Sequence, residues 1–274
     1  MEQCNIVFIG GGNMAGSIIG GLLQGDCPAK NIYICDPDQA KLDAFQQRYG
    51  VNISTYNDQF VGLADVLVLA VKPQMMHQVV EGLASKMSHE TLLVSVAAGI
   101  REKDIARWLR KEQAIVRCMP NTPSLVQTGA SALYANDQVS DAQRDLAESL
   151  MRTVGIVVWL EHEAQMDAVT AVSGSGPAYF FLVMEAMQES AEQLGLNPEM
   201  SRLLVIQTAL GAAKMAMESE EEVTKLRHRV TSPGGTTEQG IKALQAGALE
   251  KTFDEALQAA CRRSKELAKM LGDA

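Results

Sequence analysis

A glycine-rich turn near the start of the chain constrains the fold more than any other feature. An apolar run, Asn5–Ile9, leads directly into the residues GGGNMA. These match the G-x-G-x-x-G/A pattern, with Gly10, Gly12 and Ala15 at its three defining positions. Gly10 permits a tight turn, Gly12 lets the backbone approach a pyrophosphate, and Ala15 lets a helix lie close to the preceding strand. The pattern therefore predicts a strand, a dinucleotide-binding turn and a helix.

The helix after the turn is expected to provide the phosphate contacts. It should begin near Asn13 and Met14, where free N–H groups and the positive end of the helix dipole can face an anion. A glycine-rich turn that binds no ligand is the alternative, because the pattern is short. An acid at the end of the next apolar run favours the dinucleotide interpretation.

That acid is Asp36, which follows Ile32–Cys35 at about the spacing at which dinucleotide folds place a carboxylate on the adenosine ribose. Because a carboxylate repels a 2′-phosphate, Asp36 favours NADH over NADPH. No arginine follows until Arg48, so we expect no compensating basic group at the strand end. Asp36 can also cap the next helix, with Pro37 in its first turn, and the two roles can coexist.

The two halves of the chain differ in pattern. As far as about Leu160, short β-branched runs alternate with amphipathic segments, as in strand, crossover helix and parallel strand. The expected buried strands are Asn5–Ile9, Ile32–Cys35, Val66–Val71, Leu92–Val96 and Ile115–Cys118. The expected helices between them are Met14–Gln24, Pro37–Tyr49, Met75–Lys86 and Glu102–Lys111. The fold class is α/β, with a Rossmann-type, doubly wound parallel sheet in a dinucleotide-binding domain over residues 1–162.

Beyond Trp159 the strand pattern gives way to Ala, Met, Leu, Gln and Glu at helical spacing. Residues 163–274 are therefore predicted to form an all-helical domain that binds substrate and dimerises. Tyr179–Leu194 and Arg202–Met217 carry apolar residues on more than one face, which requires burial on several sides. We expect a second subunit to cover part of this surface.

Further segments follow the predicted strands at their carboxyl ends, the edge where doubly wound sheets bind ligands. Ala70, Val71, Lys72 and Pro73 follow one strand, and Ala97 and Ala98 follow the next. Small side chains would let a nicotinamide approach the backbone, although they also serve plain packing. Met119–Pro123 occupies the equivalent place one strand later.

Two segments interrupt the helical half, and each precedes a long helix. They are Ser173–Pro177 and Thr231–Thr237. In the second, Thr236 and Gln239 have the spacing of a capping box, so a helix should begin beside glycines whose amides can face an anion such as a substrate carboxylate. A helix–helix turn without a ligand is the alternative for both.

The chain offers no obvious proton donor for a carbonyl reduction. Its four histidines form no recognisable acid–base arrangement; they are His77, His89, His162 and His228. A lysine could donate the proton instead. A substrate that arrives already protonated, such as an imine, would need no donor.

Charge and cysteine content limit the partners and the compartment. A net charge of −9, with no local run of Lys or Arg, repels phosphate backbones and anionic lipids, so neither nucleic acid nor membrane is expected as a partner. The longest apolar stretches, Val66–Val71 and Thr91–Ile100, are shorter than the roughly 18 residues that a bilayer span needs. The five scattered cysteines have no metal-ligand spacing, so we expect reduced thiols, no metal site and a cytoplasmic protein.

Five segments, in order along essentially the whole chain, resemble the pyrroline-5-carboxylate reductase family. The segment Ser232–Glu238 is highly specific, whereas the glycine-rich turn is common to many families. The others are Ala70–Pro73, Cys118–Pro123 and Ser173–Pro177. The resemblance implies NADPH- or NADH-dependent reduction of an imino acid, 1-pyrroline-5-carboxylate, to L-proline, in dimers that often assemble further.

The resemblance also implies site residues. Around the cofactor it places Gly12, Asn13, Asp36, Asn57, Lys72 and Ala98. Around the substrate it places Arg229, Thr236 and Thr237, and we expect Ser175, Ser232, Gly234 and Gly235 to complete that site. Amides of this last loop would bind the carboxylate, and the catalytic Thr237 hydroxyl would hydrogen-bond the ring nitrogen. Many members use NADPH and carry a hydroxyl residue where Asp36 stands, so both cofactors stay open.

Two other classes remain as alternatives. A hydroxyacid dehydrogenase would share the fold, but in that family a catalytic lysine follows a similar glycine-serine-glycine turn, where this chain has Tyr179, Phe180 and Phe181. A reductase of another cyclic imine would share the fold and the cofactor but not the second loop. A non-enzymatic nucleotide-binding or pyridoxal-type regulatory protein is disfavoured by the intact Thr236 and Thr237.

Overall fold

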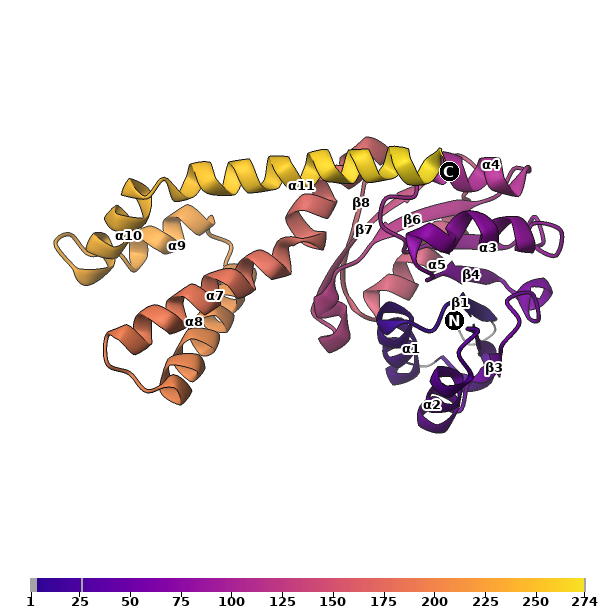
Figure 1. The fold of residues 1–274 in the computed structure, drawn as a ribbon, viewed down its shortest axis with the longest axis horizontal. Coiled ribbons are helices and arrows are strands. Elements are labelled where there is room, and N and C mark those ends of the chain that lie inside the picture. The colour runs from indigo at the N-terminus through magenta and orange to yellow at the C-terminus, as the bar shows by residue number, and fades with distance from the viewer. Residues whose placement is uncertain (1–3, 26, 274) are drawn as a thin grey trace. The chain divides into compact units, whose positions relative to one another are not determined.

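The computed structural model describes residues 4–25 and 27–273. The chain forms two compact units, which are described separately below (Figure 1). The sheet unit comprises residues 1–175 and 259–274, and the helical unit comprises residues 176–258. No helix in the described part of the chain is both long enough and apolar enough to cross a membrane.

The sheet unit is built on one mostly parallel sheet with the strand order β3-β2-β1-β4-β5-β6-β7-β8. Its first strands are β1 (Ile6–Ile9), β2 (Ile32–Cys35), β3 (Asn52–Ser54), β4 (Val66–Leu69) and β5 (Leu92–Ser95). They are followed by β6 (Ile115–Met119), β7 (Gly129–Ala135) and β8 (Gly155–Trp159). Only the pairing of β6 with β7 is antiparallel among the described strands. The predicted doubly wound α/β fold is confirmed, whereas β3, β7 and β8 were not among the expected strands.

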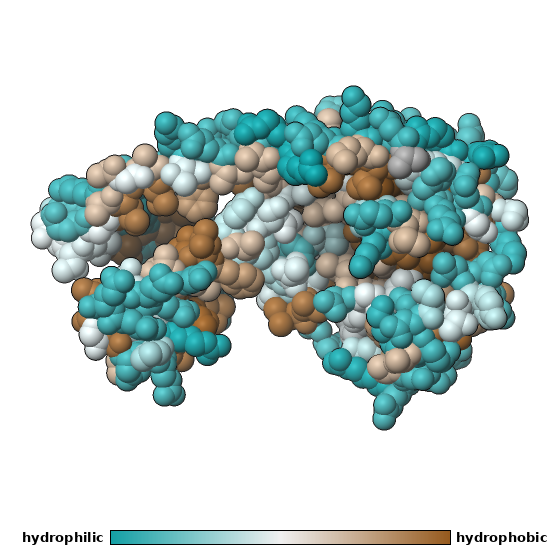
Figure 2. All heavy atoms as spheres, in the orientation of Figure 1, coloured by the Kyte–Doolittle hydropathy of each residue, from teal (hydrophilic) through white to brown (hydrophobic). Residues whose placement is uncertain are grey.

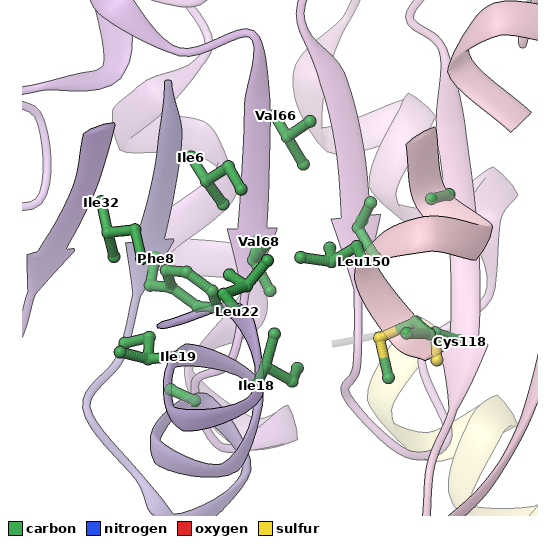
Figure 3. Packing of buried hydrophobic residues seen from close by; sticks show 14 of the residues in the cluster. Ile6, Phe8, Ile18, Ile19, Leu22, Ile32, Val66, Val68, Cys118 and Leu150 are labelled. Atoms are coloured by element: carbon green, nitrogen blue, oxygen red, sulfur yellow. The ribbon is translucent and has the colours of Figure 1, made fainter. Parts of the chain in front are cut away.

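Helices cover both faces of the sheet, so the central strands are apolar on both sides. On one face lie α1 (Asn13–Gln24), α2 (Gln39–Tyr49) and α5 (Asp141–Arg152). Figure 3 shows Ile18, Ile19 and Leu22 of α1 lying close to Phe8 and Val68 of the sheet. Each such fully buried side chain contributes about 1.5–3 kcal/mol relative to an exposed one. This packing fixes where α1 begins relative to β1.

The opposite face carries α3 (Met76–Leu83) and α4 (Glu102–Leu109). Met76 and Val80 of α3 and Ile105 of α4 pack against the alternate residues of the same strands, such as Val7 and Leu67. Consecutive residues of β1 therefore belong to two different cores. This explains why the strand is a continuous apolar run.

The helical unit lacks an apolar core of its own. It contains α7 (Gly176–Gln193), α8 (Pro198–Glu218), α9 (Val223–Arg229) and α10 (Thr236–Ala246), and α11 (Leu249–Gly272) begins in it. Val205 is the one buried hydrophobic residue among its described residues. Phe180, Leu203 and Met217 are each at least 66% exposed, and Figure 2 shows hydrophobic surface over α7 and α8. The prediction that these helices carry apolar surface on more than one face is confirmed.

Candidate functional site

Gly10 closes the turn after β1. Its backbone φ of +104° is one that residues with side chains rarely adopt, and its N–H donates to the Cys35 carbonyl at 2.7 Å. A Cβ at this position would lie 2.6 Å from the Ala70 carbonyl oxygen. Glycine is therefore required here by the backbone of the folded chain itself.

Gly12 presents the opposite case. Its backbone is extended (φ −80°, ψ −178°), so any residue could adopt it, and a Cβ built there meets no atom within 4 Å. It is the N-cap of α1, and in the described part of the chain no side-chain hydrogen bond caps this helix end. Neither conformation nor packing calls for glycine, whereas close approach of a ligand to the first N–H groups of α1 does. This open position fits a dinucleotide pyrophosphate.

Asp36 anchors the turn through its carboxylate. Oδ2 accepts the Gly11 N–H at 2.7 Å and Oδ1 accepts the Asp38 N–H at 2.9 Å, in a residue that is 7% exposed. The expected role of Asp36 as a helix cap is wrong. Instead Asp38 caps α2 by accepting the N–H groups of Ala40 and Lys41, because α2 begins only at Gln39 and its first N–H groups are out of register with Asp36.

A basic group does lie beside Asp36, contrary to expectation. The Lys41 ammonium is 3.7 Å from Asp36 Oδ1 and 3.8 Å from Asp38 Oδ2. The first turn of α2 carries Lys41 back over the end of β2, a placement that linear distance along the chain did not reveal. Arg48 lies at the other end of α2, where its guanidinium covers the ring of Tyr49.

The strand register brings the other predicted cofactor residues to the same edge. Ile9 pairs with Cys35 and Leu69, and Leu69 pairs with Ser95, so these parallel strands end side by side. The segments directly beyond them include Asn57 after β3, Ala70, Val71, Lys72 and Pro73 after β4, and Ala97 and Ala98 after β5. Ala97 is buried and Ala98 is exposed, so the small-residue segment both packs and faces outward.

The loop after β6 is tied to the start of the helical half. The Asn121 side chain donates to the Ser173 carbonyl at 3.2 Å and accepts the Ala130 N–H at 2.9 Å. Residues 170–174 form a π-helical turn, and the Ser175 N–H donates to the Thr170 carbonyl at 2.8 Å. Such turns are frequent at functional sites. Asn121 was not singled out from the sequence, because a loop asparagine carries no distinctive local pattern.

The predicted substrate loop lies in the helical unit, between α9 and α10. Gly234 has a φ of +71°, and a helix begins beside the glycines as expected, with Thr236 as the first residue of α10. The expected capping box of Thr236 and Gln239 is wrong, because Gly235 is the N-cap and no side chain caps the helix in the described structure. Instead the Gly234 N–H donates to Glu238 Oε2 at 3.0 Å. An amide of this loop thus already binds a carboxylate.

Arg229 ends α9, and its guanidinium forms an ion pair of 2.6 Å with Glu221. Both side chains are well exposed, so the pair is weakly held and the guanidinium can exchange partners. Ser175 belongs to the sheet unit, whereas Arg229 and the residues of the loop belong to the helical unit.

The buried cysteines are poor nucleophiles. Burial raises the pKa of the Cys35 thiol to about 12, and a smaller contribution comes from Asp58. Burial also raises the pKa of Cys118 well above its ordinary value. Because the thiolate is the reactive form, these residues pack and do not react.

Two family models match the chain. "NADP oxidoreductase coenzyme F420-dependent" matches residues 5–99, and "Pyrroline-5-carboxylate reductase dimerisation" matches residues 163–267. Together they include the glycine-rich turn and the loop between α9 and α10.

Individual relatives match over nearly the full length. A pyrroline-5-carboxylate reductase of Pseudomonas aeruginosa is 51% identical over 272 residues, which is 99% of this chain and 100% of that protein. The structure of a pyrroline-5-carboxylate reductase from Coxiella burnetii superposes with a TM-score of 0.93 at 50% identity, covering 96% of this chain and 98% of the other. The Plasmodium falciparum pyrroline carboxylate reductase with NADP bound gives 0.87 at 29% identity, covering 98% and 99%. This chain belongs to the pyrroline-5-carboxylate reductase family.

Proposed function

We propose that this chain reduces 1-pyrroline-5-carboxylate to L-proline with NAD(P)H, as the final step of proline synthesis in the cytoplasm. The observation that carries the proposal is Gly12, a glycine that the folded chain does not itself require, at the uncapped start of α1. The loop Ser232–Glu238, whose sequence is specific to the family, supplies the proposed substrate contacts. The cysteines of the described residues are free thiols, which is compatible with a reducing compartment.

The carboxyl edge of the sheet holds the cofactor. The first N–H groups of α1, at Asn13 and Met14, bind the pyrophosphate beside Gly12. Asn57, Lys72 and the segment from Ala70 to Pro73 line the same edge, and Ala97 and Ala98 leave room for the nicotinamide. Bound NAD(P)H supplies the hydride that reduces the C=N bond.

The loop between α9 and α10 holds the substrate. Its amides at Gly234 and Gly235 bind the carboxylate, and the Gly234 bond to Glu238 is the intramolecular counterpart of that interaction. The Arg229 guanidinium leaves Glu221 and pairs with the substrate carboxylate instead. Ser232 adds a hydroxyl group to this loop, and Ser175, in the sheet unit, remains a predicted substrate residue.

Thr237 orients the reacting bond. Its hydroxyl hydrogen-bonds the ring nitrogen, which fixes the face of the imine that receives the hydride. A protonated imine needs no further acid, since hydride addition to the iminium carbon yields the secondary amine directly. Catalysis is then mostly positioning, which removes part of the entropic cost of bringing two ligands together.

Self-association completes the helical unit. We assign substrate binding and dimerisation to residues 163–274 and dinucleotide binding to residues 1–162, although residues 163–175 and 259–274 belong to the sheet unit. The start of the dimerisation family model at residue 163 supports this boundary, and the exposed apolar residues of α7 and α8 support a dimer, with higher assembly open.

The test is consumption of NADPH and NADH by the purified protein. We expect oxidation of the dinucleotide when 1-pyrroline-5-carboxylate is added, with proline as the product, and at least a hundredfold lower rates with 2-oxo acids. Equal rates with 2-oxo acids would favour a hydroxyacid dehydrogenase. Binding of the dinucleotide without turnover of the imine would favour a non-enzymatic protein.

A further inference from the structure

The Asp36 carboxylate is already committed to the backbone of the turn. Both of its oxygens accept N–H groups, one from Gly11 in the turn and one from Asp38 at the start of α2, and the residue is almost fully buried. The Gly11 N–H is buried, so releasing it would leave it without a partner, which is costly. Asp36 is therefore held in place by the fold, and its position does not depend on which dinucleotide binds.

Lys41 stands over this carboxylate at the surface. Its ammonium lies within 4 Å of Asp36 and Asp38, and its side chain is 52% exposed. Lysine carries its charge on a flexible four-carbon stem, so the ammonium can move to a nearby phosphate without any change in the backbone. The exposed pair holds it only weakly. A mobile cation thus lies beside the position at which dinucleotide folds place the adenosine ribose.

The charges around Lys41 make its ammonium important for binding a 2′-phosphate. A 2′-phosphate at the ribose would approach Asp36 and Asp38, both of which repel it. Lys41 is the basic side chain that pairs with both of these carboxylates in the described structure. Arg48 lies seven residues further along α2, roughly 10 Å along the helix axis.

We propose that Lys41 determines whether this enzyme accepts a dinucleotide with a 2′-phosphate, whereas Asp36 positions the Gly10–Ala15 turn for either dinucleotide. When the bound dinucleotide carries a 2′-phosphate, the Lys41 ammonium leaves Asp36 and pairs with the phosphate oxygens. When the ribose has a free 2′-hydroxyl, the ammonium keeps its carboxylate partners. The inference rests on the proposed placement of the cofactor on the turn.

The test compares Lys41→Glu with the matched control Lys30→Glu. Lys30 is exposed and precedes β2, so it lies at the opposite edge of the sheet and undergoes the same change of charge. We expect Lys41→Glu to lower kcat/KM for NADPH at least tenfold and that for NADH less than threefold. The control should change both by less than twofold. Parallel losses for both dinucleotides in Lys41→Glu would overturn the role of Lys41.

Asp36→Asn tests the positioning role. An asparagine oxygen can accept one of the two N–H groups, but its amide nitrogen then faces the other donor. We expect weaker binding of NADPH, NADH and reduced nicotinamide mononucleotide, although the last has no adenosine ribose, with the smallest loss for NADPH because the variant also removes one charge that repels the 2′-phosphate. A gain in NADPH with a loss confined to NADH would make Asp36 the selectivity residue and overturn the inference.

A third variant separates this inference from the placement on which it rests. If Gly12→Ala binds both dinucleotides normally, the placement of the cofactor on the turn is wrong, and the inference fails with it. If Gly12→Ala loses both dinucleotides while Lys41→Glu shows no selectivity change, only the role of Lys41 fails.

Discussion

Replacing Gly12 by alanine adds a single methyl group that should weaken dinucleotide binding and leave the fold intact. The new Cβ would meet no protein atom within 4 Å, and the extended backbone at Gly12 accommodates alanine. Alanine is a poorer N-cap than glycine, which costs at most about 1 kcal/mol. For a unit of this size, that lowers the melting temperature by roughly 2–4 °C. The folded chain should therefore tolerate the substitution.

Binding of the dinucleotide should not tolerate it. The methyl group would stand where the pyrophosphate approaches the first N–H groups of α1. Losing one hydrogen bond to a charged group costs about 1.5–3 kcal/mol. At 1.4 kcal/mol for each factor of ten, the dissociation constants of NADPH and NADH should rise roughly 10- to 150-fold. Titration of dinucleotide fluorescence measures this directly.

Gly10→Ala is the contrasting variant. Its Cβ would lie 2.6 Å from the Ala70 carbonyl oxygen at a backbone φ of +104°. The backbone strain alone is of order 1–3 kcal/mol. We expect this variant to lose thermal stability as well as binding. Dissociation constants within twofold of the parent in a folded Gly12→Ala protein would refute the assignment of Gly12 to the cofactor.

Three further predictions concern the substrate loop, a buried cysteine and the oligomeric state. Thr237→Ala should lower kcat at least tenfold with an unchanged dinucleotide dissociation constant, Thr237→Ser should retain most activity, and full activity in the alanine variant would remove the assigned role. With a pKa of about 12, Cys35 is thiolate in about one molecule in ten thousand at pH 8. Iodoacetamide should therefore not label it before unfolding. Rapid labelling of the folded protein would contradict its burial. Light scattering should give at least twice the chain mass of 29.6 kDa, and Leu203→Glu should lower it, whereas a monomeric parent would exclude the dimer.

Local sequence patterns predicted the central strands and most of the helices flanking them. Continuous apolar runs such as Ile6–Ile9 are readable because both faces of the strand are buried. β7 was missed because its sequence GASALYA is rich in small residues, which have low strand propensity. Glycine is needed at Gly129, the first residue of β7, since a Cβ there would lie 2.8 Å from the Val154 carbonyl oxygen beside β8. That requirement exists only between strands and leaves no local signal.

Local sequence patterns were sufficient to predict the two binding loops of this protein. The turn from Gly10 to Ala15 and the loop Ser232–Glu238 are contiguous, so their spacing identifies them without a structure. Tertiary structure decided which groups meet, because contacts such as that between Gly11 and Asp36 join residues far apart in the chain. Only the structure shows that Asp38 caps α2 and that the Lys41 ammonium lies beside the Asp36 carboxylate. The charge at the proposed adenosine end of the site therefore depends on tertiary contacts, which local sequence patterns do not reveal.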